Sequence, residues 1–376
     1  VYGKTSDGHI WFQTEKKRSQ FEICPNCASP SSCVYDHRTV RIKDEPIRGK
    51  GVTLIVRKRR YKCSPCKRVF TEPIQGILPR RRTSQRFRRS LVWACNNFSS
   101  LKDVRKAYRC SSSLLYKALY EQLDLNVRRN LNYPWPKTIG IDEHFFRRGK
   151  YHREFVTVFV DYNNKRMREM VNSRTTGVLI EELRHIDGRE NVRNVIMDMS
   201  GPYRSFAEKQ FPHARIIADK FHVLRLLNPA INRHRKLVTG DSRKNPVRKL
   251  LLMRGDRLEP YKRRALHKWL DDNQTLKELY AFKEALHSFY RIKGTGRARR
   301  ALQKITDLMA LSKIPEIRTL RRTLMSWREE ILNYFDGRLT NGRTEGFNNV
   351  SKLVQKRGYG YKNFENYRLR NLNVCC

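Results

Sequence analysis

The stretch Thr138-Ile139-Gly140-Ile141-Asp142-Glu143 is the strongest indication of the fold of this chain. It is a short apolar run that ends in a carboxylate. A second stretch, Val195-Ile196-Met197-Asp198-Met199, repeats the pattern. Short apolar runs of this kind predict buried strands. We therefore expect Asp142 and Asp198 to leave adjacent strands of a central sheet near a common crevice.

The segments around these two stretches alternate between strand and helix patterns. Strands are expected at 138–146, 153–162, 166–172, 193–199 and 214–219, and helices at 175–186 and 202–211. This order is typical of an α/β domain. Residues 221–335 predict helices only, since apolar residues such as Leu279, Leu286, Leu320 and Leu324 recur at helical spacing.

A third carboxylate, Glu345, stands in Asn341-Gly342-Arg343-Thr344-Glu345-Gly346, where a helix to about Arg357 begins. At helical spacing Glu345 shares one face with Asn349, Lys352 and Lys356, while Phe347, Val350 and Val354 share the face expected to pack on the sheet. Three carboxylates at one crevice could hold two Mg²⁺ or Mn²⁺ ions. The alternative for a single strand-end aspartate is a helix cap.

The charge of the chain indicates a polyanionic partner. Its 376 residues include 80 Lys and Arg against 36 Asp and Glu, a formal charge of +44. Nucleic acid is favoured over an anionic membrane surface, because no stretch reaches the roughly 18 apolar residues that span a bilayer. We expect a cytoplasmic protein, since no signal segment opens the chain and its odd number of cysteines, with two Cys-x-x-Cys pairs, favours metal binding over disulfides. It begins at Val1, which is consistent with a missing initiator region.

Four of the nine cysteines form two pairs, Cys24-x-x-Cys27 and Cys63-x-x-Cys66. Two such knuckles can present four thiolates to one structural Zn²⁺, with a β-hairpin between them, as in a zinc ribbon. Unrelated buried or redox cysteines are the alternative. Cys33 and His37 are possible substitute ligands.

Residues 84–125 predict three helices at helix-turn-helix spacing, although three short helices are also an ordinary packing unit. Cations around them favour DNA phosphate binding. The candidate phosphate contacts are Arg57, Lys58, Arg59, Arg60, Arg80, Arg81, Arg82 and Arg86. The candidate base contacts, early in the third helix, are Ser111, Ser112, Ser113, Tyr116 and Lys117. Lys352 and Lys356 could also face DNA.

Two further polar segments flank the expected crevice. Asp219-Lys220-Phe221-His222 follows the last strand, so Asp219 and His222 are candidates for site-proximal roles. Asp219 could be a further metal ligand or could cap the next helix. His222 could contact a phosphate or base near the cut, or be a satisfied histidine at the edge of the crevice. Glu143 and His144 could act indirectly, by contacting the residues that bind the metal. Side chains alternate along a strand, so Glu143 should point away from Asp142 and should not bind the metal directly.

These motifs resemble the ISL3 family of bacterial insertion-sequence transposases, a branch of the DDE transposases. The matching segments are Gly140–Glu143, Met197–Tyr203, Asp219–His222 and Asn341–Asn349, together with the four-cysteine segment and the helices after it. The resemblance implies a ribonuclease-H-like domain interrupted by an all-helical insertion. It also implies that Asp142, Asp198 and Glu345 are the catalytic, metal-binding triad.

The resemblance divides the chain into five parts. They are an arm and zinc ribbon at 1–76, a helix-turn-helix domain at 77–132, the first catalytic part at 133–222, a helical insertion at 223–338 and the final catalytic helix at 339–376. The implied reaction is cleavage at terminal inverted repeats followed by 3′-hydroxyl attack on target DNA, in a homodimer or larger complex on the bacterial nucleoid.

Three other functions remain to be weighed against a transposase. A DNA-binding regulator descended from one would have lost carboxylates, yet all three are present. A structure-selective nuclease of the same fold has less need of the zinc and helix-turn-helix modules. An RNA-binding factor would need a single-strand stacking motif. Trp269 and Trp327 could stack a flipped base, but core packing is the better expectation.

Overall fold

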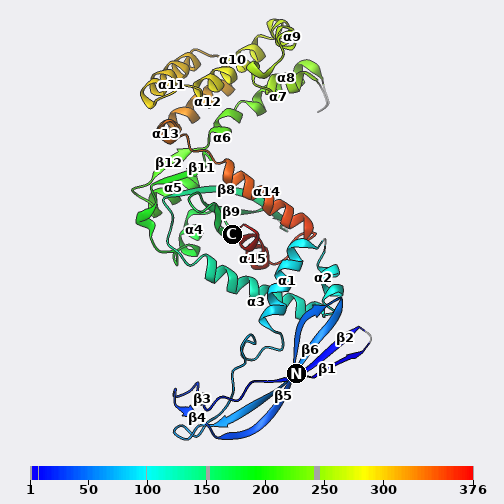
Figure 1. Ribbon diagram of the computed structural model, residues 1–376. Helices are drawn as coiled ribbons and strands as arrows, with labels where there is room; N and C mark the ends of the chain where they lie inside the picture. The colour runs from blue at the N-terminus through cyan, green and yellow to red at the C-terminus, as the bar shows by residue number, and fades with distance from the viewer. Residues whose placement is uncertain (1, 7, 99, 150–152, 241–245, 376) are drawn as a thin grey trace. The chain divides into compact units, whose positions relative to one another are not determined.

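The computed structural model describes residues 2–6, 8–98, 100–149, 153–240 and 246–375. The chain divides into two compact units, one of Val1–Asn132 with Leu353–Val374 and one of Tyr133–Lys352 with Cys375–Cys376. Figure 1 labels the helices and strands of each unit. The chain therefore leaves the first unit, builds the second, and returns to the first.

The first unit begins with a five-stranded sheet. Its strands are β1 (Tyr2–Ser6), β2 (His9–Glu15), β5 (Val34–Ile47), β6 (Lys50–Lys62) and β7 (Val69–Thr71). They run in the order β1-β2-β6-β5, with β7 also on β6 and with β2 and β6 parallel. The long β5–β6 hairpin confirms the strands expected between the cysteine pairs. The hairpin β1–β2 was not predicted, because its residues are mostly polar.

Three helices follow, at α1 (Gln85–Asn97), α2 (Leu101–Ala107) and α3 (Ser112–Asn130), as the sequence predicts. A serine hydroxyl accepts a backbone N–H at the start of each, which satisfies one of the free donors there. The last helix, α15 (Phe364–Val374), packs on α3, and Asn373 donates from Nδ2 to the Leu123 carbonyl at 3.0 Å. The C-terminal segment thus belongs to this unit.

The second unit is built on a mixed five-stranded sheet. Its strands are β8 (Thr138–Arg148), β9 (Arg153–Asp161), β10 (Arg166–Val171), β11 (Asn194–Met197) and β12 (Arg215–Ala218), in the order β10-β9-β8-β11-β12. The first three pair antiparallel, and β11 pairs parallel with both β8 and β12. The helices α4 (Thr176–Glu182) and α5 (Gly201–Gln210) complete the predicted order.

A helical segment interrupts this unit. Its helices are α6 (Lys220–Arg225), α7 (Asn228–Thr239), α8 (Pro246–Leu252), α9 (Pro260–Asp271), α10 (Gln274–Phe289), α11 (Thr295–Ala310), α12 (Pro315–Ser326) and α13 (Arg328–Gly337). The leucines expected to form its core are buried, and so is Trp327. Arg204 of α5 lies over the Trp327 ring at 3.6 Å and pairs with Glu330 at 2.7 Å.

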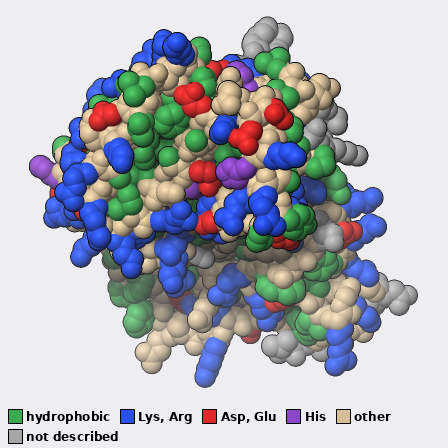
Figure 2. Space-filling model, turned by 90° about the horizontal axis from the view of Figure 1, so that it is seen from above, with side chains coloured by type: hydrophobic (Ala, Val, Ile, Leu, Met, Phe, Trp, Pro, Cys, Tyr) green, Lys and Arg blue, Asp and Glu red, His purple; other side chains and the backbone are tan. Residues whose placement is uncertain are grey.

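The surface of the helical segment carries many cations. In the view of Figure 2 the Lys and Arg side chains spread over the exposed face, with acidic side chains scattered among them. Within the described residues, no helix is long and apolar enough to cross a bilayer.

Candidate active site and zinc site

Three aspartates lie where the parallel pairing of β8, β11 and β12 ends, two of them at the carboxyl ends of their strands and Asp142 within β8. Asp142 is in β8, Asp198 directly follows β11 and Asp219 directly follows β12. The register pairs Ile196 with Gly140 and Met197 with Ala218, so all three acids fall at the same level of the sheet. The crevice outside such strand ends is where open α/β sheets bind their ligands.

His222 links two of these aspartates. Its Nδ1 lies 2.8 Å from Asp198 Oδ1 and 3.0 Å from Asp219 Oδ2, because α6 begins immediately after β12 and carries the imidazole over the strand ends. Hydrogen bonds to Asp198 and Asp219 raise the pKa of His222 to about 10. The imidazole is therefore protonated at neutral pH and balances one negative charge.

Two hydrogen bonds hold the Asp142 carboxylate. Its Oδ2 accepts a hydrogen bond from Asn348 Nδ2 at 2.8 Å, and its Oδ1 accepts one from the Glu143 backbone N–H at 2.8 Å. Burial and the nearby Asp198 carboxylate raise the pKa of Asp142 to about 7. Without further positive charge nearby, ionisation of Asp142 next to the Asp198 carboxylate is therefore unfavourable.

A stripe of buried polar residues, on the helix α14 (Gly342–Arg357) and directly before it, places Asn348 at this site. Its members are Asn341, Thr344, Asn348 and Ser351, which are each at most 3 % exposed. Of the predicted apolar face, Val354 is buried, whereas Phe347 and Val350 are only partly so. That expectation is corrected accordingly, since most of the buried side chains of α14 are small and polar.

The close approach of α14 requires a glycine in β8. A Cβ at Gly140 would lie 2.2 Å from Thr344 Oγ1 and 2.5 Å from the Tyr162 ring. Asn341 adds two bonds, with its backbone N–H donating to Asp219 Oδ1 and its Nδ2 donating to the Ile141 carbonyl, both at 3.0 Å. The Asn341-Gly342 turn and Gly140 together fix the start of the helix that carries Glu345.

Glu345 itself lies in the first turn of α14 and is exposed. Asn349, Lys352 and Lys356 are exposed too, which agrees with the predicted polar face. Among the described residues, the side chains within ligand distance of one another at this site are Asp198, Asp219 and His222. A metal-binding role for Glu345 stays a prediction, while Asn348 is a site residue that the sequence did not indicate.

A cavity of about 1110 Å³ opens beside Asp198 and His222. Glu143 lines it, whereas Asp142 faces α14, so strand alternation separates the two as expected. Glu143 accepts hydrogen bonds from Arg174 Nη1 and from the Tyr203 hydroxyl, both at 3.0 Å. These bonds fix a carboxylate at the cavity wall and hold an arginine next to it.

The cavity also has a cationic and aromatic wall that sequence patterns did not reveal. Arg147, Arg153 and Arg174 line it together with Phe155. The Arg174 guanidinium lies over the Phe155 ring at 4.5 Å, and Arg147 pairs with Glu154 at 2.7 Å. In the sequence, the only indication of this wall was that arginines lie near the ends of strands. A chain with 80 Lys and Arg has many such positions, so this indication was not specific.

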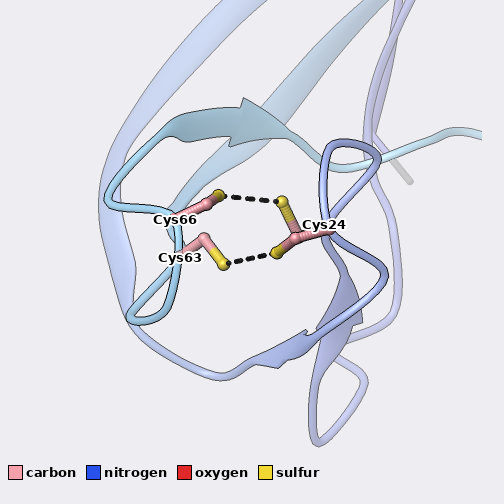
Figure 3. Close-up of side chains that lie close together, drawn as sticks. Cys24, Cys63 and Cys66 are labelled. Atoms are coloured by element: carbon pink, nitrogen blue, oxygen red, sulfur yellow. Dashed lines mark hydrogen bonds between the residues drawn. The ribbon is translucent and has the colours of Figure 1, made fainter.

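The four predicted cysteines converge in the first unit. Figure 3 shows the labelled side chains of Cys24, Cys63 and Cys66 pointing toward one another from two turns. The Sγ atoms of Cys24 and Cys66 are 3.7 Å apart, and those of Cys27 and Cys63 are 3.4 Å apart. A tetrahedral Zn²⁺ with sulfur ligands at about 2.3 Å separates its sulfurs by roughly 3.8 Å, so this set fits the ion.

The two cysteine turns are built alike. The backbone N–H of Cys24 donates to the Ser29 carbonyl and that of Cys63 to the Arg68 carbonyl, both at 2.9 Å. Ala28 and Lys67, each directly after the second cysteine, both have a positive φ. Hydrogen bonds from Ser29 lower the pKa of Cys27 to about 6, which favours the thiolate that a metal requires. Cys33 and His37 are exposed and are not part of the cluster.

The predicted DNA-binding cations differ in exposure. Arg57, Arg80 and Arg82 are exposed, as are Tyr116 and Lys117 of α3. Arg59 is only 9 % exposed, because its side chain turns inward to Glu72 at 3.2 Å. Arg60, Arg81 and Arg86 pair with Asp36, Glu121 and Asp44, respectively. Arg59 therefore stabilises the sheet and does not join the surface cations.

Comparison with known proteins identifies a transposase of the DDE class and specifies its family. A model for the DDE domain of ISL3 elements, described as transposase, matches residues 139–371, and one described as the zinc-finger of transposase IS204/IS1001/IS1096/IS1165 matches residues 20–66. The transposase for insertion sequence element IS1001 of Bordetella parapertussis is 25 % identical over 369 residues, 94 % of this chain and 89 % of that protein. The chain belongs to the ISL3 family of DDE transposases.

Proposed function

We propose that this transposase cuts DNA at terminal inverted repeats and joins the freed 3′-hydroxyl to target DNA, using a ribonuclease-H-like domain. The observation that carries the proposal is the register of β8, β11 and β12, which aligns Asp142, Asp198 and Asp219 at the same level of the sheet. The mixed sheet order β10-β9-β8-β11-β12 supports the ribonuclease-H-like assignment.

Asp142, Asp198 and Glu345 would hold two Mg²⁺ or Mn²⁺ ions. The raised pKa of Asp142 supports this, because a buried carboxylate beside a second carboxylate is stabilised by an added cation. Glu345 lies about one helical turn before Asn348, the residue that donates to Asp142. The helix α14 would therefore place the Glu345 carboxylate near the same crevice. Divalent ions in such a site activate the attacking hydroxyl group and stabilise the leaving oxygen.

Asp219 and His222 would position Asp198 and α14. Asp219 is 2 % exposed and receives the Asn341 backbone N–H, so it fixes the start of α14. His222 keeps its proton between Asp198 and Asp219 and thereby restricts the Asp198 carboxylate to one orientation. The exposed Asn349 would lie toward the DNA.

Substrate phosphates would enter the cavity beside Asp198. Arg147, Arg153 and Arg174 supply cations there, and Glu143 and Phe155 hold the Arg174 guanidinium in place. A fixed guanidinium suits phosphate, because its planar fork of donors matches the phosphate oxygens. We assign phosphate binding to this wall and carboxylate chemistry to the strand ends.

End recognition would fall to the first unit. The four-thiolate Zn²⁺ site would stabilise the ribbon, and α2 and α3 would act as a helix-turn-helix with Ser112, Ser113, Tyr116 and Lys117 near the bases. Ser111 accepts the Leu114 backbone N–H and is therefore used as a cap. Pairing of two ends requires a dimer or larger complex, working on the bacterial nucleoid in the cytoplasm.

The test is strand cleavage of labelled DNA that carries the element's inverted repeats. Asp142→Asn, Asp198→Asn and Glu345→Gln should each abolish Mg²⁺-dependent cleavage and strand transfer while leaving DNA binding intact. Asp307→Asn, at an exposed acid of α11, is the matched control and should cut normally. Cleavage by the three site variants at the wild-type rate would refute the triad.

The same assay separates the alternatives. A DNA-binding regulator would bind the repeats without cutting them, and a structure-selective nuclease would cut branched DNA without joining it to a target. Joined products that depend on the repeats support only the transposase.

A further inference from the structure

The loop between α14 and α15 presents an aromatic side chain to solvent. Its sequence is Arg357-Gly358-Tyr359-Gly360-Tyr361-Lys362. Tyr359 is 92 % exposed, the highest value among the exposed large hydrophobic side chains of the described residues. Its φ is +51°, in the left-handed region that residues with a Cβ seldom adopt.

The backbone of this loop is firmly closed on the helix. Gly358 N–H donates to the Val354 carbonyl at 3.0 Å, Tyr359 N–H to Lys356 at 3.1 Å and Gly360 N–H to Gln355 at 3.0 Å. These bonds satisfy carbonyls that a helix end otherwise leaves free. The exposed position of Tyr359 is therefore set by an ordered helix terminus.

The second tyrosine of the loop anchors it. The Tyr361 ring lies 5.2 Å from the ring of the buried Tyr367, and a Cβ at Gly358 would come within 2.6 Å of Tyr361. Gly358 thus leaves space for Tyr361 to pack inward. With Tyr361 fixed on the core of the first unit, Tyr359 is directed away from it.

At 92 % exposure, the Tyr359 side chain gains little from burial in the folded chain. A glycine or asparagine would adopt the left-handed conformation at lower cost, and a polar side chain would suit a position this exposed. An aromatic ring there is explained when a ligand covers it. The ring therefore indicates a contact that forms in the bound state.

The charges beside the ring specify the ligand. Lys356, Arg357 and Lys362 are exposed, and residues 353–363 contain no Asp or Glu. An aromatic ring among cations is the combination that binds single-stranded nucleic acid, with the ring on a base face and the cations on phosphates. A protein or lipid partner would favour a broader apolar surface than one ring.

We propose that Tyr359 stacks on an unpaired or extruded base of bound DNA, with Lys356, Arg357 and Lys362 on the adjacent phosphates. This rests on the proposed function only in requiring that the chain binds DNA. Stacking would stabilise bases exposed when the duplex opens at a transposon end, and it needs no particular base sequence.

The experiment uses the full-length protein and single-stranded DNA that contains 2-aminopurine, whose fluorescence falls on stacking. Wild type and Tyr359→Phe should quench the probe. Tyr359→Gly should leave it bright and bind the strand about tenfold more weakly. Because glycine suits the left-handed conformation, the thermal midpoint of Tyr359→Gly should not fall. Tyr359→Asn, which also tolerates this conformation, is a second variant with the same expected result.

Tyr261→Ala, at a tyrosine of α9 that is 59 % exposed, is the matched control and should quench as wild type does. Unchanged quenching and affinity in both Tyr359→Gly and Tyr359→Asn would refute stacking and leave the proposed function intact. A fall in thermal midpoint in both variants would assign Tyr359 a structural role and also refute the proposal. Failure of wild type to bind any DNA would refute both.

Discussion

Asn348 and Asn349 are adjacent in the sequence, yet only Asn348 supports the carboxylates. It donates to Asp142 at 2.8 Å and contacts His144 Nδ1 through its Oδ1 at 3.1 Å, whereas Asn349 is exposed. Residues that orient metal ligands typically change metal affinity by about 10- to 100-fold when removed. Asn348→Ala should therefore raise the Mg²⁺ concentration needed for half-maximal cleavage at least about tenfold.

The control for this prediction is Asn349→Ala, measured in the same metal titration of cleavage. Its half-maximal Mg²⁺ concentration should stay at the wild-type value, even if DNA affinity changes. Equal metal dependence of the two variants would show that the bond from Asn348 to Asp142 has no role in metal binding.

Gly140 offers a second test at the residue scale. In Gly140→Ala the new methyl group would meet Thr344 Oγ1 and the Tyr162 ring, so α14 must move away from the sheet. Overpacking of this kind costs about 1–3 kcal/mol in the free energy of unfolding. Denaturant titration should detect it, together with slower cleavage, because α14 carries Glu345 and Asn348.

Gly177→Ala in α4 is the matched control, since a Cβ there meets nothing within 4 Å. It should leave stability unchanged or raise it by up to about 1 kcal/mol, because alanine favours helix. If Gly140→Ala were as stable as Gly177→Ala, the close packing of α14 on β8 would be contradicted.

At the scale of elements, the apolar runs of the sequence predict β8 to β12 because these strands are buried on both faces. Asp142, Asp198 and Asp219 were found by the same signal, since each follows such a run. The packing of α14 could not be predicted, because Thr344, Asn348 and Ser351 are polar and apolar periodicity does not register them. The return of α15 to the first unit depends on contacts with α3, which no local pattern encodes.

The zinc ribbon is the element whose folding should depend on metal. Cys63→Ser removes one of four thiolates, so the protein should lose its bound zinc and the ribbon should become protease-sensitive. Zinc per chain, measured by atomic emission after gel filtration, should fall from about one to near zero. Cys33→Ser should retain the zinc, because Cys33 is outside the cluster. Zinc retained by Cys63→Ser at the wild-type level would contradict the four-thiolate site.

At the scale of the whole molecule, the charge of +44 sets how DNA binding responds to salt. Each exposed cation on a phosphate releases about one counterion, so the slope of log K against log salt counts such contacts. Arg80 and Arg82 are exposed beside α1, unlike Arg59, which Glu72 neutralises. The double change of Arg80 and Arg82 to Gln should reduce the slope by about two and weaken binding to all sequences alike.

A charge-matched control is the double change of Arg184 and Lys277 to Gln. Both cations already lie near acids, Arg184 near Glu181 at 3.9 Å and Lys277 near Asp271 at 2.8 Å, so they should release few counterions on DNA binding. Fluorescence anisotropy across a salt series gives both slopes. Equal slopes for the two double variants would mean that DNA is held by the net charge of the chain. A reduced slope confined to the Arg80 and Arg82 variant would assign phosphate contacts to the first unit, because net charge falls equally in both proteins.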